Sequence, residues 1–513
     1  MAKLSDLSVE LLELILSNFP STDRCTLLRL CRTSKQLCSI AQPRLFREFS
    51  CARPRPWRDI PGSFSYRGSG PKFPLFYFTH TILMRPDLAS KVRDIIIESY
   101  DNDLMYSADD EYLDTPSPEM MENFKRSLEG LPLLSDQLCT WTINLGKLEV
   151  TAVLALLLSR TPNAKSLHIT LHSNPLTEVG YLTGKHIPGA DGSLVPFCSG
   201  LTNLKVIPGN CNQSHRLQQT TPLLRLPALE TFRAEGLLGY NEYKLTHTPQ
   251  LDIEPGTLNI SHLELFSSRR KQNSKNQNPK IELFCVSFDS PCLAALITGC
   301  KGLRTFRYRG DNPTLNGYPM KQVTPAEIQL ALEPHKHSLE RLEIDVGSVN
   351  YRLSEEGLER HAFTSFEGYT RLKRLDVPYT FAVGAEELPP SIEHLTMRGC
   401  KSGVFGGTAR MVSLGIRPSL RTIEIDRFVT EYLYFQQWAG SSSLEEACQK
   451  MVDVLRGTEI SVYASVCRSP PEGPTNIVAG RAVMVYFDKD GFEVKDDTYN
   501  VFESNYNCRE AFW

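Results

Sequence analysis

Residues that could carry chemistry are scattered along this chain and do not form a recognisable motif. The 513 residues include 11 histidines and 14 cysteines, yet no two cysteines have CxxC spacing. His335 and His337 are one residue apart, but no second pair accompanies them to complete a zinc site. The chain also lacks a P-loop, a GxGxxG after a strand, a GxSxG and an HExxH. We therefore expect that the protein is not an enzyme and that it has no catalytic residue, metal site or cofactor. The less favoured alternative is an enzyme whose site is assembled from distant residues on an α/β core.

Composition and charge narrow the class of protein further. Apolar residues make up 41% and charged residues 22% of the sequence, which is ordinary for a folded protein. The net charge of −3 gives no general attraction to nucleic acid or to an anionic membrane. The N-terminus is too polar for a secretory signal, and the longest apolar run, near Val150 to Leu158, is too short to cross a bilayer. We expect reduced cysteines, a cytoplasmic or nuclear location, and neither a membrane nor nucleic acid as partner.

The first fifty residues predict three short helices with more apolar surface than they can bury. Residues 8–19 form the first helix, with Ser8 as N-cap, and Ser21 or Thr22 is expected to cap the second. Apolar residues lie on two neighbouring arcs of the first helix, namely Leu11, Leu12, Leu14, Ile15, Leu16 and Phe19. A unit of this size cannot bury all of these side chains in its own core. The remaining apolar side chains pack either on the rest of the chain or on another protein, and the pattern alone does not distinguish these two possibilities.

The order of these residues resembles the F-box family over about forty positions. The run LSDLSVELLELILSNFPSTDRCTLLRLCRTSKQLCSIAQPRLFREF has the leading Leu7, then Pro20 and Asp23, and ends in Pro43-x-Leu45-Phe46. It departs from the family in having Ser8 where a proline is usual, and in lacking the tryptophan often found after Cys31.

The resemblance implies an interaction and no reaction. F-box units bind a Skp-type adaptor, which joins them to a cullin and a RING protein that recruits ubiquitin-charged enzyme. Carried over by position, the adaptor-binding residues would be Leu7, Leu11, Leu12, Ile15, Leu27, Leu30 and Cys31. The sequence thus favours a substrate-recognition adaptor of a Skp-cullin-F-box ubiquitin ligase. A non-catalytic scaffold that uses the same helices outside ubiquitin transfer is the alternative.

The rest of the chain repeats a six-residue signature, apolar-x-x-apolar-x-apolar. After an irregular connector, residues 76–98 resemble a segment that follows the F-box in filamentous-fungal members. The middle apolar positions of ten copies are Ile95, Leu167, Leu204, Phe232, Leu263, Phe306, Leu342, Leu375, Leu395 and Ile423. From Leu167 onward they are 20 to 43 residues apart, similar to irregular leucine-rich repeats. The alternative is a generic α/β domain, in which buried parallel strands look alike.

Helices are expected between these strands. TAVLALLLSR and SPCLAALITGC fit, and Thr324 to Glu327 forms a capping box with Pro325 at the first helical position. His335 and His337 are expected to close the end of that helix. Two insertions read as loops, the acidic residues 101–123 and the basic residues 269–280, either solvated or in contact with a target.

These patterns give an α/β fold class in four parts. We expect a three-helix F-box-like domain at 1–50 and a connector with the first helices at 51–90. A leucine-rich-repeat-like solenoid follows at 91–430, and a helix-and-strand cap at 431–513 ends the chain. The cap should contain a hairpin turn at Asp488 to Gly491. Nothing in the sequence names the target protein or the surface that binds it.

Overall fold

The structure is a computed structural model that divides the chain into two compact units. Unit 1 comprises Met1–Thr248, Gly256–Ile260 and Arg270–Phe284, and unit 2 comprises Pro249–Pro255, Ser261–Arg269 and Cys285–Trp513. The residues described are 7–19, 23–52, 74–98, 116–147, 149–171, 176–188, 193–208, 215–238, 251–266, 268–271, 281–284, 290–310, 314–315, 318–319, 323–345, 362–378, 387–398, 404–413, 419–428, 444–468 and 481–497.

Unit 1 begins with the three expected helices, α1 (Val9–Ser17), α2 (Arg24–Thr33) and α3 (Lys35–Leu45). The Ser8 hydroxyl accepts the N–H of Leu11 at 3.4 Å, which confirms Ser8 as N-cap of α1. The expected cap of α2 was wrong, because Asp23 fills that position and accepts the N–H of Thr26 at 3.2 Å. Ser21 and Thr22 lie outside the described residues.

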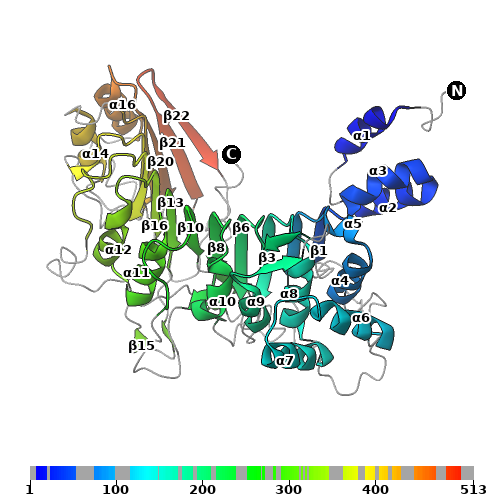
Figure 1. Ribbon diagram of the computed structural model, residues 1–513. Helices are drawn as coiled ribbons and strands as arrows, with labels where there is room; N and C mark the ends of the chain where they lie inside the picture. The colour runs from blue at the N-terminus through cyan, green and yellow to red at the C-terminus, as the bar shows by residue number, and fades with distance from the viewer. Residues whose placement is uncertain are drawn as a thin grey trace. The chain divides into compact units, whose positions relative to one another are not determined.

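Five parallel strands follow in unit 1, with helices along one side (Figure 1). The strands are β1 (Glu48–Ala52), β2 (Asp94–Glu98), β3 (Ser166–Leu171), β6 (Asn203–Pro208) and β8 (Thr231–Glu235). The helices are α4 (Pro74–Met84), α5 (Pro86–Ala89), α6 (Pro118–Leu128), α7 (Ser135–Gly146), α8 (Val150–Arg160), α9 (Thr177–Leu182) and α10 (Leu217–Leu224). Short pairs are formed by β4 (His186–Pro188) with β5 (Leu194–Pro196), and by β7 (His215–Arg216) with β9 (Leu237–Leu238).

Unit 2 continues the same alternation and ends in a hairpin. Its parallel strands are β10 (His262–Phe266), β13 (Thr305–Arg309), β16 (Arg341–Asp345), β17 (Arg374–Pro378), β18 (His394–Arg398), β19 (Thr422–Phe428) and β20 (Ser461–Arg468). Strand β21 (Arg481–Phe487) pairs antiparallel with β20, and β22 (Phe492–Asp497) pairs antiparallel with β21. The expected turn joins β21 to β22, and in it Asp488 donates its N–H to the Gly491 carbonyl at 3.0 Å. The helices are α11 (Ser290–Gly299), α12 (Pro325–Leu332), the 3-10 turn η3 (Glu333–His335), α14 (Val404–Ser413) and α16 (Leu444–Leu455), and β14 (Thr314–Leu315) pairs with β15 (Tyr318–Pro319).

The repeat signature gives the strand register. Within each unit, its middle positions pair with one another on neighbouring strands, as Phe306 does with Leu342 and Leu342 with Leu375. All ten are buried, so they and the third positions fill the core between strands and helices. Two further strands carry the pattern at Phe49 in β1 and Val462 in β20, in register with Ile95 and Ile423.

A backbone hydrogen-bond motif recurs at the start of most coils. The carbonyl of Ser261 accepts the N–H groups of Arg304 and Thr305, at 2.8 and 3.0 Å. The carbonyl of Arg304 does the same for Glu340 and Arg341, one coil later. Unit 1 has the same arrangement, beginning with the carbonyl of Arg47. A bond pattern that recurs coil by coil is the property of a repeat structure, and the predicted leucine-rich-repeat-like α/β solenoid is confirmed.

The expected helices are present, whereas the two expected insertions differ in extent from the prediction. The helices expected at 151–160, 290–300 and after Thr324 are α8, α11 and α12. The acidic insertion is shorter than expected, because residues 118–123 already belong to α6, while 101–115 lie outside the described residues. The basic insertion begins inside β11 (Ser268–Lys271), which pairs with β12 (Ile281–Phe284), and residues 272–280 are likewise not described.

No single helix of the described residues is long and apolar enough to span a bilayer. Helices α7 and α8 meet the length and composition criterion only as a pair, bent by 116° between them.

Candidate functional site

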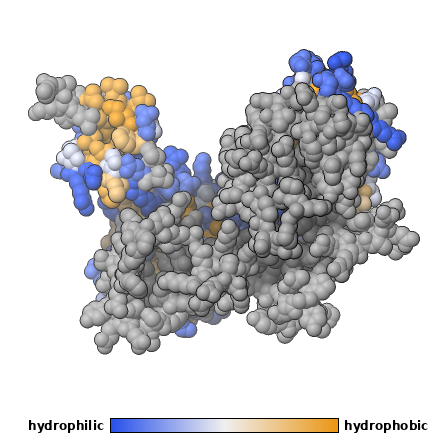
Figure 2. Space-filling view, turned by 180° about the vertical axis from the view of Figure 1, so that it is seen from behind, coloured by the Kyte–Doolittle hydropathy of each residue, from blue (hydrophilic) through white to orange (hydrophobic). Residues whose placement is uncertain are grey.

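The three N-terminal helices bury one set of apolar side chains and expose another. Their small core is formed by Leu12, Leu16, Leu27, Leu37, Ile40 and Ala41. A second set remains 36% to 63% exposed, and it consists of Val9, Leu11, Leu14, Ile15, Phe19 and Leu28. Figure 2 shows apolar side chains gathered over this N-terminal helical part of unit 1. Six large apolar side chains exposed on α1, on α2 and at Phe19 just after α1 form a surface suited to bind another protein.

The predicted adaptor-binding residues are divided between these two sets. Leu11 and Ile15 are exposed, whereas Leu12 and Leu27 are each 1% exposed and belong to the core. The other three, Leu7, Leu30 and Cys31, are partly buried against that core. The sequence-based set omitted four exposed residues, namely Val9, Leu14, Phe19 and Leu28. Leu14 and Phe19 could have been found from the surplus of apolar positions on the first helix.

The exposed surface is attached firmly to the first coil of the solenoid. Arg24 in α2 donates to the backbone carbonyls of Glu48 and Ser50 in β1, at 3.0 and 3.2 Å. The ring of Phe78 in α4 stacks on those of Phe46 and Phe49, with centroids 5.8 and 4.2 Å apart. Arg24 thus holds α2 against β1, and Phe78 holds the end of α3 and β1 against α4.

Cys31 offers no nucleophile on this surface. Burial, and secondly the neighbouring thiol of Cys38, raise the pKa of the Cys31 thiol above its ordinary value of 9.0. The thiol is therefore protonated at neutral pH and behaves as a small apolar group.

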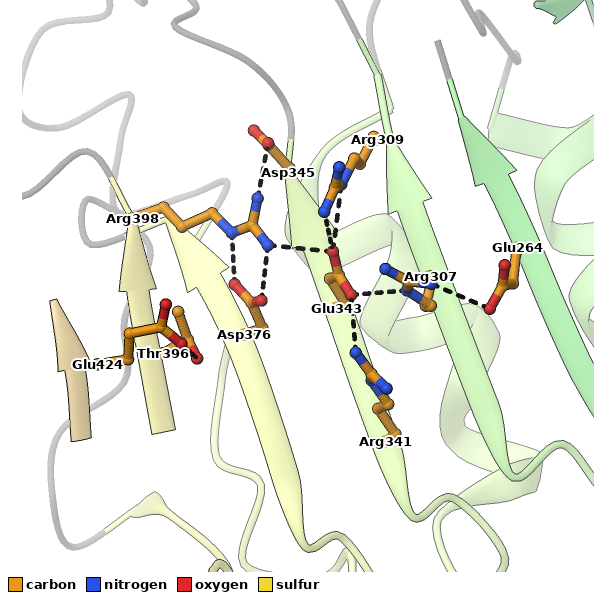
Figure 3. A network of polar contacts seen from close by, with 10 residues as sticks. All are labelled: Glu264, Arg307, Arg309, Arg341, Glu343, Asp345, Asp376, Thr396, Arg398 and Glu424. Atoms are coloured by element: carbon orange, nitrogen blue, oxygen red, sulfur yellow. Dashed lines mark hydrogen bonds and ion pairs between the residues drawn. The ribbon is translucent and has the colours of Figure 1, made fainter. Parts of the chain in front are cut away.

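A network of ion pairs covers part of the strand face that points away from the helices in unit 2 (Figure 3). Strand alternation puts Phe306 and Tyr308 in the core and Arg307 and Arg309 on this other face. The carboxylate of Glu343, on the next strand, is fully buried. It accepts from Nε of Arg307 and Nη2 of Arg309, both at 2.6 Å.

Arg398 extends the network across two more strands. Its guanidinium binds both carboxylate oxygens of Asp376, at 2.5 and 2.6 Å, and reaches Asp345 and Glu343 at 3.0 Å each. Residues more than fifty positions apart in the sequence are thus joined on one face. The sequence held a signal for it, since the position between the last two apolar residues of the signature is charged in four successive strands, at Glu264, Arg307, Glu343 and Asp376.

The protonation states of this network follow from opposing effects. Burial alone would raise the pKa of the Glu343 carboxyl, but the hydrogen bond and charge of Arg307, with the charges of Arg398 and Arg309, hold it well below its ordinary value of 4.5. Burial disfavours the charge of Arg398, and its pKa is nevertheless raised by Asp376, Asp345 and Glu343. Glu343 and Arg398 are therefore both charged at neutral pH.

His335 has a structural position inside the solenoid. We expected it to close the end of its own helix, but its side chain instead links to the preceding coil. Its Nε2 lies 2.9 Å from the carbonyl of Ile297 near the end of α11, and its Nδ1 accepts the N–H of Leu303 at 3.3 Å. With Nδ1 as acceptor the ring is neutral, and burial lowers the pKa of His335 below its ordinary value of 6.5.

The comparisons with known proteins concern the N-terminal helices. The comparison with curated proteins finds no match. The family model of the F-box domain matches residues 4–45, which include α1, α2 and α3. F-box domains are typically parts of non-catalytic adaptors, in agreement with an exposed apolar surface. From the fold of these helices, their surface and this match, we conclude that the chain carries an F-box domain at residues 4–45, followed by a leucine-rich-repeat-like α/β solenoid.

Proposed function

We propose that this protein is the substrate-recognition adaptor of a Skp-cullin-F-box ubiquitin ligase. Its F-box domain would bind a Skp-type adaptor, and its solenoid would bind a target protein. The observation that carries the proposal is the F-box match at residues 4–45 together with the exposed apolar side chains of α1 and α2.

The contact with the Skp-type adaptor would be made by the exposed set of side chains. Leu11, Leu14 and Ile15 in α1 provide its centre, and Leu28 in α2 extends it. Buried clusters of this kind contribute most of the binding energy of a protein interface. Leu12 and Leu27 would act indirectly, by holding the helices in place from the core.

The solenoid supports the second half of the proposal. Stacked coils present exposed side chains from neighbouring strands as one continuous surface, which is how repeat proteins bind partners. We infer that these coils belong to the leucine-rich-repeat class, because the signature aligns in register and most coils begin with the same backbone hydrogen bonds. We infer too a kinship with filamentous-fungal F-box proteins, from residues 76–98, and a cytoplasmic or nuclear location, where such ligases act.

Replacing Leu11 and Ile15 by aspartate tests the adaptor contact. Both side chains are exposed, so the fold should tolerate the change, whereas an unpaired charge buried in an interface costs several kcal/mol or more. We expect the affinity for a purified Skp-type adaptor to fall at least 100-fold, measured by calorimetry. The matched control is Leu330→Asp in α12, which is 73% exposed and should leave binding unchanged. Unchanged binding in the folded Leu11/Ile15 variant would refute the proposal.

A second measurement separates the ligase from a scaffold outside ubiquitin transfer. Proteins trapped by a version lacking residues 1–45 should be stabilised in cells when the full chain is removed. If their lifetimes do not change while the Skp-type adaptor still binds, the scaffold function is the correct one.

A further inference from the structure

Three basic side chains form a row on neighbouring strands of unit 2. Arg341 in β16 pairs in register with Arg374 in β17, and Arg374 pairs with His394 in β18. Neighbouring strands are about 4.8 Å apart, so the row spans roughly 10 Å. Like charges opposite one another destabilise a sheet. A counter-charge would therefore stabilise the facing guanidinium groups of Arg341 and Arg374.

The acidic side chains around this row are already engaged. Both oxygens of Asp376 bind Arg398, and Glu343 is held by Arg307, Arg309 and Arg398 as well as by Arg341. On the coil before the strands, Glu340 pairs with Arg371 at 3.4 Å and Glu393 with Lys373 at 3.0 Å. The network therefore has no carboxylate to spare for Arg374.

Arg374 is the member of the row without a counter-charge, whereas burial and the charge of Arg374 lower the pKa of His394, so that its imidazole is a neutral hydrogen-bonding group. Among the described residues, no hydrogen bond or ion pair is formed by the side chain of Arg374 or of His394. The Nε atoms of Arg341 and Arg374 are buried and have no hydrogen-bond partner. The row remains accessible, since the Arg341 side chain is 34% exposed and His394 is exposed. Guanidinium groups that are partly withdrawn from water bind oxyanions more strongly than fully exposed ones.

We propose that this row, defined by Arg341, Arg374 and His394, binds a doubly charged oxyanion group of the target protein. A phosphorylated side chain or a pair of adjacent carboxylates has this chemistry. The same register continues to the hydroxyl groups of Thr422 and Ser461, which can donate further hydrogen bonds to the same segment. The proposal rests on the proposed function, because it assigns the target-binding site of the same substrate receptor.

The test uses the full chain and three degenerate peptide libraries that differ only at a fixed centre of phosphoserine, Glu-Glu or Ser-Ala. We expect at least one anionic library to bind the native protein ten times more tightly than the neutral one, and the better library identifies the source of the charge. The double variant Arg341→Gln/Arg374→Gln should lose this preference, and Arg374→Lys should retain part of it. Arg456→Gln, on a side chain 71% exposed after α16, is the matched control and should retain all of it.

Two results would overturn the proposal. In one, both anionic libraries bind no more tightly than the neutral library, and in the other the preference survives in the double variant. Binding of the Skp-type adaptor is measured on the same samples. The Leu11/Ile15 aspartate variant should keep the anion preference and the Arg341/Arg374 variant should keep the adaptor, so failure of one proposal is distinguishable from failure of the other.

Discussion

Glu343 is the residue on which the ion pairs of unit 2 converge. Its carboxylate has no exposed surface, and it faces guanidinium groups from three strands. Because its pKa is lowered in the folded state, the folded protein binds fewer protons than the unfolded chain near that pKa. This contribution to stability is present above the unfolded value of 4.5, and it is lost as the pH falls below that value toward the lower folded pKa.

Glu343→Gln should destabilise unit 2 by about 3–5 kcal/mol, because it keeps the shape but leaves buried arginines without a counter-charge. Chemical denaturation monitored by circular dichroism measures the change. Glu333→Gln is the control, because its pair with Lys336 is 3.6 Å long and its side chain is 48% exposed. That variant should differ from the native protein by less than about 1 kcal/mol. Equal effects of the two substitutions would contradict the description of the network.

His335→Gln should destabilise the solenoid by about 1–3 kcal/mol at pH 7.5, since it disturbs two buried hydrogen bonds. The native protein should itself lose stability as the pH falls through 6.5, because the folded state holds the ring neutral and the unfolded chain binds a proton. The difference between the two proteins should therefore shrink at pH 5.5. His337→Gln, at an exposed side chain, is the control and should change the stability at pH 7.5 by less than about 0.5 kcal/mol. A difference that grows on acidification would exclude a neutral buried His335.

At the level of elements, helix α12 shows how local sequence defines a boundary. The Thr324 hydroxyl accepts the N–H of Glu327 at 3.2 Å, and the Glu327 carboxylate accepts the N–H of Thr324 at 2.9 Å. Pro325 occupies the first helical position, where its missing N–H costs nothing. Both halves of the capping box predicted from the sequence are present.

Thr324→Ala should lower the free energy of unfolding by about 0.5–2 kcal/mol, since it leaves an N–H at the helix start without its partner. Adding Glu327→Ala should cost less than the sum of the single changes, because each residue caps the other. Thr140→Ala, in an exposed helical position where the hydroxyl bonds only to its own helix, is the control for the substitution itself. Strict additivity of Thr324 and Glu327 would mean that the box is not formed.

The strands were predictable because alternation and repetition are local properties. Where the signature is incomplete, prediction failed to recognise a coil: Glu459 replaces the first apolar residue before β20, although Val462 still aligns with Ile423. Strand β1 was overlooked because Phe46 and Phe49 directly follow the helical motif. Side-chain placement was harder, since the adjacent Leu11 and Leu12 are 49% and 1% exposed and a linear motif does not distinguish them. The charged positions of the signature indicate a charged strand face, but they do not give its pairs, which lie up to 55 residues apart and depend on the strand register.

For the molecule as a whole, the two units contribute different parts of the proposed function. Unit 1 carries the F-box domain and its exposed apolar side chains, fixed to the first strand through Arg24. Unit 2 carries the charged strand face and the basic row. A protein with these two surfaces would connect a target to the ligase without performing any chemical step itself.

The most direct test of this account is hydrogen exchange of the full chain with and without a purified Skp-type adaptor. We expect slower amide exchange in α1 and α2, over Val9–Ser17 and Arg24–Thr33, with unit 2 unchanged. Side-chain docking of Leu11, Leu14, Ile15 and Leu28 would suppress the opening of these short helices. Protection confined to unit 2, or no protection in α1 and α2 at saturating adaptor, would contradict the claim that these helices are the docking surface.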